Sequence, residues 1–122
     1  TAPTDIYTLS LHDALPISIS GEVRVFVSFM SFMEVFYITA QERDLEEAHV
    51  RVHLMEALPV ARVESTVPLC IAAARLKADH RMSVADAWIA ALALESNAIL
   101  IHKDPEFEQI ENVVAVQKLP YK

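Results

Sequence analysis

The chain has 122 residues, of which 53% are apolar and 22% charged, enough for one domain with a hydrophobic core. Its net charge of −7 does not favour non-specific binding to nucleic acid, which depends on phosphate neutralisation by Lys and Arg. The single glycine argues against a many-turned β-barrel or sandwich. The single cysteine excludes an internal disulfide and is typical of a reducing compartment.

No stretch of the sequence has the length and uniform apolarity of a membrane span. The longest apolar stretch, residues 23–40, is interrupted by Arg24, by Glu34 and by serines. No segment carries the basic region of a signal peptide. We therefore expect a cytoplasmic protein that does not enter a membrane.

The N-terminal segment, residues 1–18, differs from the rest of the chain. It has no clear periodicity and no helix cap, and Ile6–Ile17 resembles one reading frame of a common sequencing-adapter oligonucleotide. We expect this segment to be foreign, with residues 19–122 forming one domain that is incomplete at its N-terminus. The alternative is an ordinary variable N-terminus.

From Glu22 onwards, apolar periodicity and capping residues predict alternating strands and helices. The expected elements are a strand at 23–27, helices at 28–42 and 45–58, a strand at 60–64, a helix from Ser65 or Thr66 to 79, a helix from the Ser83 cap to Asn97, and strands at 98–102 and 113–117. The last strand is expected at a sheet edge. Strands separated by helices indicate an α/β fold with a parallel sheet.

Two aspartates stand at the heads of neighbouring elements in the most regular part of the sequence. Asp86 lies in the first turn of the helix that Ser83 caps, and Asp104 follows the strand 98–102. Both carboxylates can meet at one edge of the sheet, which is the usual place for sites in open α/β folds. Each aspartate also has a structural explanation, because Ser83-x-x-Asp86 has capping-box spacing and Asp104-Pro is a turn signal.

Glu34 is the third acid of interest, and its pattern allows two interpretations. Ser28, Ser31 and Glu34 recur every three residues, as in a solvated stripe along one side of a helix. Alternatively, the apolar residues around Glu34 direct its carboxylate into a cleft, where it needs a cation.

Other reactive residues give weaker signals. His49 and His53 share a helix face but lack a third ligand with zinc-like spacing. Cys70 lies among apolar neighbours and is expected in the core. The basic residues near the aspartates have two interpretations, a phosphate-binding cluster or a solvated surface. These residues are Arg75, Lys77, Arg81 and Lys103. His102, beside Asp104, is a candidate phosphate contact or a sheet residue.

Four segments resemble the PIN domain family, and within it the VapC-type toxins of bacterial and archaeal toxin–antitoxin pairs. They are Val25-Phe-Val-Ser-Phe-Met-Ser-Phe-Met-Glu34-Val-Phe-Tyr, Leu76-Lys-Ala, Ser83-Val-Ala-Asp86-Ala-Trp-Ile-Ala-Ala and Ile99-Leu-Ile-His-Lys-Asp104-Pro-Glu-Phe107. The resemblance covers residues 22–122. It implies a three-layer α/β fold with a central parallel sheet flanked by helices, in which the first strand is missing or replaced.

The resemblance also implies an activity and its residues. It implies an endoribonuclease that depends on Mg²⁺ or Mn²⁺, with Glu34, Asp86 and Asp104 as metal-binding and catalytic acids, and Glu106 as a peripheral candidate. Candidate phosphate contacts are Arg81, His102 and Lys103. The implied partners are RNA, a cognate antitoxin and a second copy in a homodimer.

One family motif is not matched in this sequence. The family's first aspartate follows the opening strand in an Asp-Thr/Ser-Ala motif, which the segment around Asp13 imitates only superficially. We therefore expect this chain to be inactive or poorly folded, although its parent is an enzyme. An alternative function is a non-catalytic binding module, whose apolar helices 29–38 and 45–58 hold a partner helix.

Overall fold

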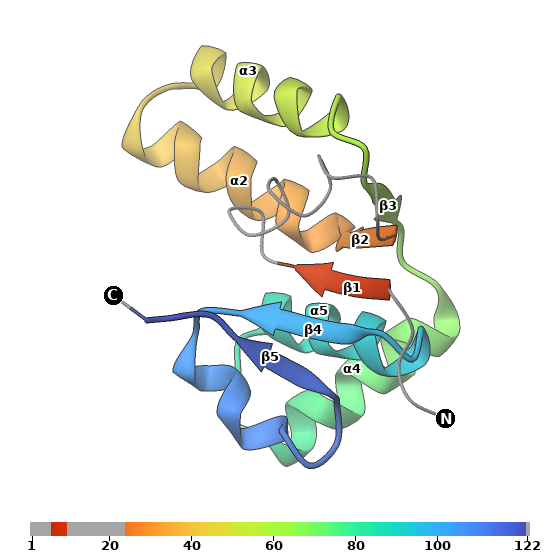
Figure 1. Ribbon diagram of the computed structural model, residues 1–122. Helices are drawn as coiled ribbons and strands as arrows, with labels where there is room; N and C mark the ends of the chain where they lie inside the picture. Colours follow the sequence, from red (N-terminus) through yellow and green to blue (C-terminus); the bar gives the residue numbers. More distant parts are fainter. Residues whose placement is uncertain (1–5, 10–23, 122) are drawn as a thin grey trace.

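The computed structural model describes residues 6–9 and 24–121, which form a parallel five-stranded sheet with helices on both faces (Figure 1). The strand order is β3-β2-β1-β4-β5. The elements are β1 (Ile6–Leu9), β2 (Arg24–Ser28), α2 (Phe29–Glu42), α3 (Leu45–Glu56), β3 (Ala61–Val63), α4 (Val67–Asp79), α5 (Val84–Glu95), β4 (Ile99–His102), the 3-10 helix η1 (Pro105–Ile110) and β5 (Val116–Lys118). The predicted α/β class and parallel sheet are confirmed.

Strand register assigns the helices to the two faces of the sheet. Val25 and Val27 lie on the same face as Ile101, and this face packs against α2 and α3 through Phe32 and Met55. Leu100 lies on the opposite face, in a larger core cluster with residues of α4, α5 and η1. The site therefore lies at the edge of a sheet that is covered on both faces.

Hydroxyl and carboxylate caps start the four α-helices of the described residues, as the sequence predicts. The side chains of Ser28, Asp44, Thr66 and Ser83 each accept a hydrogen bond from a backbone N–H two or three residues further on. At the other end of α5, Asn97, where the sequence predicted the helix to end, has φ 50°, a left-handed conformation that closes helices. The helix boundaries therefore follow from local chemistry.

The centre of the sheet is occupied by residues in which the sequence indicated no element. Ile6–Leu9 forms β1, which pairs in parallel with β2 on one side and with β4 on the other. The first strand was expected to be either missing or replaced. The structure excludes the first alternative, because a strand is present at this position. Backbone hydrogen bonds to two neighbours form this strand without any need for side-chain periodicity. The foreign origin of residues 1–18 stays a prediction, and most of that segment lies outside the described residues.

Two further details differ from the sequence predictions. Strand β5 is an edge strand as expected, but it starts at Val116 rather than Val113, because residues before it continue the turn after η1. Cys70, predicted in the core, is exposed. The buried stripe of α4 consists of Leu69, Ala72, Ala73 and Leu76, and Cys70 lies beside this stripe. No helix among the described residues is long and apolar enough to cross a membrane.

Candidate functional site

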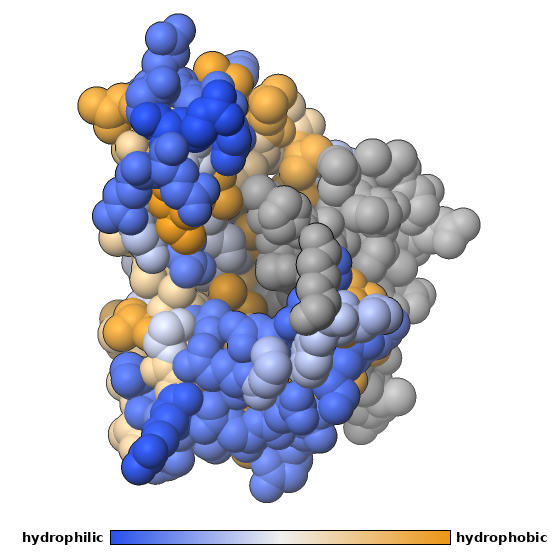
Figure 2. Space-filling model, turned by 90° about the vertical axis from the view of Figure 1, so that its left-hand side faces the viewer, coloured by the Kyte–Doolittle hydropathy of each residue, from blue (hydrophilic) through white to orange (hydrophobic). Residues whose placement is uncertain are grey.

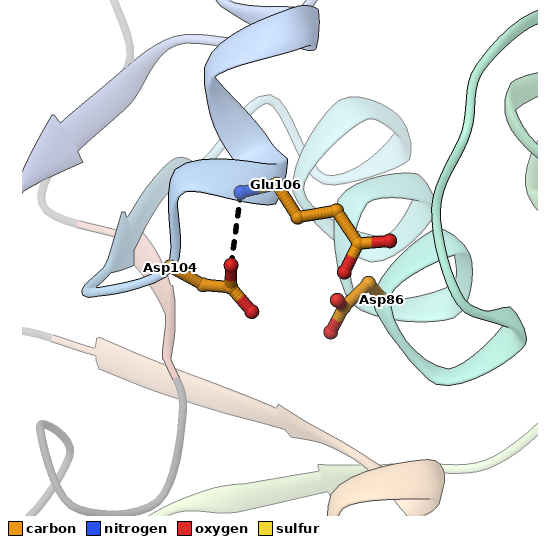
Figure 3. A group of neighbouring side chains, drawn as sticks. All are labelled: Asp86, Asp104 and Glu106. Atoms are coloured by element: carbon orange, nitrogen blue, oxygen red, sulfur yellow. Dashed lines mark hydrogen bonds between the residues drawn. The ribbon is translucent and has the colours of Figure 1, made fainter.

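Three carboxylates meet at the edge of the sheet where β4 ends (Figure 3). Asp86 comes from the first turn of α5, Asp104 follows β4, and Glu106 lies in the first turn of η1. One oxygen from each of the three side chains lies within 4.8 Å of the other two. The predicted meeting of Asp86 and Asp104 is therefore observed, and Glu106 joins them.

The local role predicted for Asp104 is present, but the capping box predicted for Asp86 is only half formed, because the Ser83 N–H donates to Glu106 and not to Asp86. The Ser83 hydroxyl accepts a hydrogen bond from the Asp86 N–H at 3.1 Å. Asp104 caps η1, since its Oδ1 accepts a hydrogen bond from the Glu106 N–H at 2.9 Å. Capping does not exclude a function for these acids, because each also presents its carboxylate to the other two.

Long-range hydrogen bonds hold η1 against the start of α5. Glu106 Oε1 accepts a hydrogen bond from the Ser83 N–H at 2.7 Å. Gln109 accepts one from the Arg81 N–H at 2.9 Å and donates one to the Arg81 carbonyl oxygen at 2.8 Å. These contacts join residues more than twenty positions apart, so no local sequence pattern indicates them. They fix the spacing between Asp86 and Asp104.

The three carboxylates lie so close together that ionisation of one disfavours ionisation of its neighbours. Burial raises the pKa of Asp86 to about 8, and the hydrogen bond and charge of Glu106 and the charge of Asp104 act in the same direction. A hydrogen bond from the Ser83 hydroxyl acts against them. Like charges held this close favour either a shared proton or a bound cation.

Glu34 stands apart from the three clustered acids, although it faces the same cleft. The cleft has a volume of about 700 Å³ and is bordered by α2, by the start of α5 and by the segment after β4. Glu34 is half-buried there, and burial raises the pKa of its carboxyl. Ser28 and Ser31 are buried at 3% and 5% exposure, so the solvated-stripe interpretation of this side of α2 is wrong.

His102 lies in the floor of the cleft and supports the turn that carries Asp104. Its Nδ1 accepts a hydrogen bond from the Asp104 N–H at 3.2 Å, and its ring contacts Phe107 at a centroid distance of 5.2 Å. Burial lowers the pKa of His102, so the imidazole favours its neutral form. Its Nε2 and the Ser31 Oγ are buried and have no hydrogen-bond partner among the residues that the structure describes. Sequence patterns did not single out Ser31 as a cleft residue, because its environment depends on packing between helices.

The four basic residues predicted near the site do not form one cluster. Lys103 lines the cleft, whereas Arg75 lines a separate groove between α4 and α5. Arg81 is exposed just before α5, where its backbone hydrogen-bonds to Gln109 of η1. Figure 2 shows the edge that carries the site, with polar residues dominating its lower part and apolar residues interspersed above, over α2 and α3.

Comparison with known proteins identifies the family. The model of the PIN domain family matches residues 7–113, and the chain therefore belongs to this family, as its motifs indicated. The match begins inside the segment that was expected to be foreign. No curated protein matches the chain.

Several solved structures share the fold. The structure of VapBC2 from Rickettsia felis bound to a promoter DNA fragment contains a chain that matches with a TM-score of 0.71 at 15% identity, covering 93% of this chain and 98% of that one. VapBC-1 from nontypeable Haemophilus influenzae matches with a TM-score of 0.69 at 20% identity, with coverages of 93% and 97%. DNA-bound VapBC from Salmonella typhimurium matches with a TM-score of 0.72 at 14% identity, with coverages of 97% and 98%.

Proposed function

We propose that this protein is a VapC-like toxin, a divalent-metal-dependent endoribonuclease that hydrolyses phosphodiester bonds in RNA. The observation that carries the proposal is the convergence of Asp86, Asp104 and Glu106 at the C-terminal edge of a PIN-domain sheet. Oxygen ligands of this kind suit Mg²⁺ and Mn²⁺. The raised pKa of Asp86 supports the proposal, because a bound cation relieves the repulsion within the cluster.

The chemistry of the site follows from its residues. Asp86 and Asp104 would hold the metal, with Glu34 facing them across the cleft. When bound, a divalent ion lowers the pKa of a coordinated water and polarises the scissile phosphate. We propose Lys103, which lines the cleft, and the exposed Arg81 as contacts to the RNA backbone. We assign His102, 1% exposed, to positioning Asp104 rather than to phosphate contact.

The same comparisons support one partner of the proposed toxin. The similar structures are VapBC complexes, and this supports a cognate antitoxin as partner of the present chain. We further propose a homodimer and a cytoplasmic location, where RNA substrates are found. We retain the prediction that the present chain is inactive, because it lacks the first aspartate motif of the family.

Exposed apolar residues on α2 and α3 favour a second candidate function, that of a protein-binding module. Met33 is 58% exposed, Leu45 63% and Leu54 62%, all on the helices that were proposed to hold a partner helix. Binding through this surface would not respond to EDTA or to substitution of the acids. The two functions can coexist, so RNA cleavage separates them.

The decisive experiment compares RNA cleavage by two repaired proteins, in which residues 1–18 are replaced by a strand ending in Asp-Thr-Ala and a helix that leads back to β2. The repaired protein is expected to cut single-stranded RNA with Mn²⁺ and to stop in EDTA. Asp86→Asn in the same background should lose about a hundredfold or more of this activity, since it removes a charge that stabilises the transition state through the metal. A circular dichroism melt checks that the fold is intact. Cleavage retained by Asp86→Asn would overturn the proposal.

A further inference from the structure

We propose that Arg51 on α3 binds a phosphate of the RNA, so that the substrate crosses the cleft from the acids to the α2–α3 hairpin and is bound as a single strand. This inference rests on the proposed function and deepens it, because it adds a substrate contact and defines the class of RNA. Arg51 binds and orients the strand in this arrangement and takes no part in hydrolysis.

Arg51 reaches the cleft because of its place on α3. The buried residues of this helix are Ala48 and Met55. Arg51 lies three residues after the first and four before the second, which places it on the same side of the helix. Its side chain is 42% exposed and lines the cleft that also holds Asp86 and Asp104. A basic residue of the hairpin therefore shares one cleft with the acids of the opposite wall.

An ion pair orients the guanidinium group of Arg51. Its Nε lies 3.2 Å from Glu47 Oε1, one turn earlier on α3. This contact uses the Nε–H, and the terminal nitrogens of a guanidinium carry its remaining N–H donors in a planar fork that matches the oxygens of a phosphate. A phosphate can therefore bind Arg51 while Glu47 keeps the side chain in place.

A polyanion that crosses this cleft needs positive charge on both walls. Among the described residues, Arg51 and Lys103 are the two Lys or Arg side chains that line the cleft. Lys103 precedes Asp104, whereas Arg51 belongs to the hairpin, and Figure 1 shows α2 and α3 on one side of β1 with α5 and β4 on the other. Because the chain has a net charge of −7, phosphates are held only where cations are placed locally.

Apolar side chains of the same cleft favour a single strand over a duplex. Val35 and Ile38 of α2 and Ile89 of α5 line the cleft, and Ile38 is 39% exposed. Such side chains can contact bases that are unstacked and splayed out, whereas the bases of an RNA duplex are paired and stacked inside it. A single strand therefore offers both its phosphates and its bases to the cleft.

The test titrates the purified chain into a short fluorescein-labelled single-stranded RNA with Mn²⁺ present, and follows anisotropy at several KCl concentrations. Arg51→Gln should raise the Kd about fivefold at about 0.1 M KCl and lower the slope of log Kd against log salt by about 0.7, as expected for loss of one phosphate contact on a single strand. Arg51→Lys keeps the charge and should keep the slope. Gel electrophoresis checks that the RNA stays intact.

Arg62→Gln is the matched control. The Arg62 side chain is also 42% exposed and also pairs with a glutamate, but it lines a different pocket. Arg62→Gln should therefore leave the slope unchanged, although it makes the same change in net charge. An unlabelled duplex of the same sequence should compete less well than the unlabelled single strand.

Each contrary outcome overturns a stated part of the inference. An unchanged slope in Arg51→Gln, with RNA binding that still depends on Mn²⁺ and is lost in Asp86→Asn, would reject the Arg51 contact and leave the proposed nuclease standing. Equal effects of Arg51→Gln and Arg62→Gln would mean that net charge alone attracts the RNA. Equal competition by the duplex would reject the single strand. No RNA binding by wild type would reject this inference together with RNA as the substrate.

Discussion

The two walls of the cleft are built differently, although both carry acids. The α5–η1 wall, residues 81–110, is tied together by hydrogen bonds between segments far apart in sequence and backs onto the larger core cluster. The hairpin wall, α2 and α3, packs mainly on itself and on one face of the sheet, and it exposes several large apolar side chains. The first wall is therefore suited to holding charges at fixed distances, and the second to contacting another molecule.

The largest difference between the walls should appear in stability. Ile110 is fully buried in the cluster behind the α5–η1 wall, so Ile110→Ala should lower the free energy of unfolding by about 2–5 kcal/mol. Leu54 on α3 is 62% exposed, and Leu54→Ala should change the free energy by less than about 0.5 kcal/mol. Urea denaturation measures both. Similar losses in the two variants would mean that the hairpin wall is covered in the protein as purified.

The next effect concerns pH and belongs to the α5–η1 wall alone. The pKa of Asp86 is raised from 3.8 to about 8 in the folded chain, so the folded state binds an extra proton between these values. Without metal, the contribution of Asp86 to stability should be fully present below about pH 4 and be lost as the pH rises toward 8. Asp86→Asn removes this dependence and should be the more stable protein at pH 8, by at least about 1.4 kcal/mol, the equivalent of one pKa unit after allowance for solvent screening.

Urea denaturation in EDTA across this pH range tests the expectation. Added Mn²⁺ should reduce the fall in stability of wild type at high pH, because the cation binds the ionised carboxylates of the folded state. An identical pH dependence in wild type and Asp86→Asn would mean that the acids in this wall are not close enough to interact.

The comparison of the walls also shows what the sequence could predict. The helix starts at Ser28, Asp44 and Ser83, and the one at Ser65 or Thr66, could be predicted because capping hydrogen bonds join residues only two or three positions apart. The meeting of Asp86 and Asp104 was predicted from the topology of parallel sheets, in which the C-terminal ends of strands share one edge. Helix caps and the alternation of strands with helices can both be recognised in short stretches of sequence.

The remaining features depend on contacts between distant residues. The bond from the Ser83 N–H to Glu106 spans 23 positions, so the pattern around Glu106 gave no reason to move it from the periphery to the cluster. The exposure of Cys70 depends on which side of α4 meets α5, and apolar neighbours in sequence do not decide this. The central strand Ile6–Leu9 has two partners that only the folded sheet supplies.

The smallest expected effect compares two helix caps, only one of which belongs to the site. Ser83 caps α5 and Thr66 caps α4, each by accepting a backbone hydrogen bond three residues on. Ser83→Ala and Thr66→Ala should each lower the free energy of unfolding by about 1 kcal/mol. Only Ser83→Ala should also weaken Mn²⁺ binding, because the lost bond positions Asp86, and outer-shell residues of this kind change metal affinity by about 10–100-fold. Urea denaturation and Mn²⁺ titration of the two variants separate the effects.

Equal weakening of Mn²⁺ binding by Thr66→Ala would show that metal affinity follows overall stability. The α5–η1 wall would then have no special role in holding the acids, and the distinction between the two walls of the cleft would be lost.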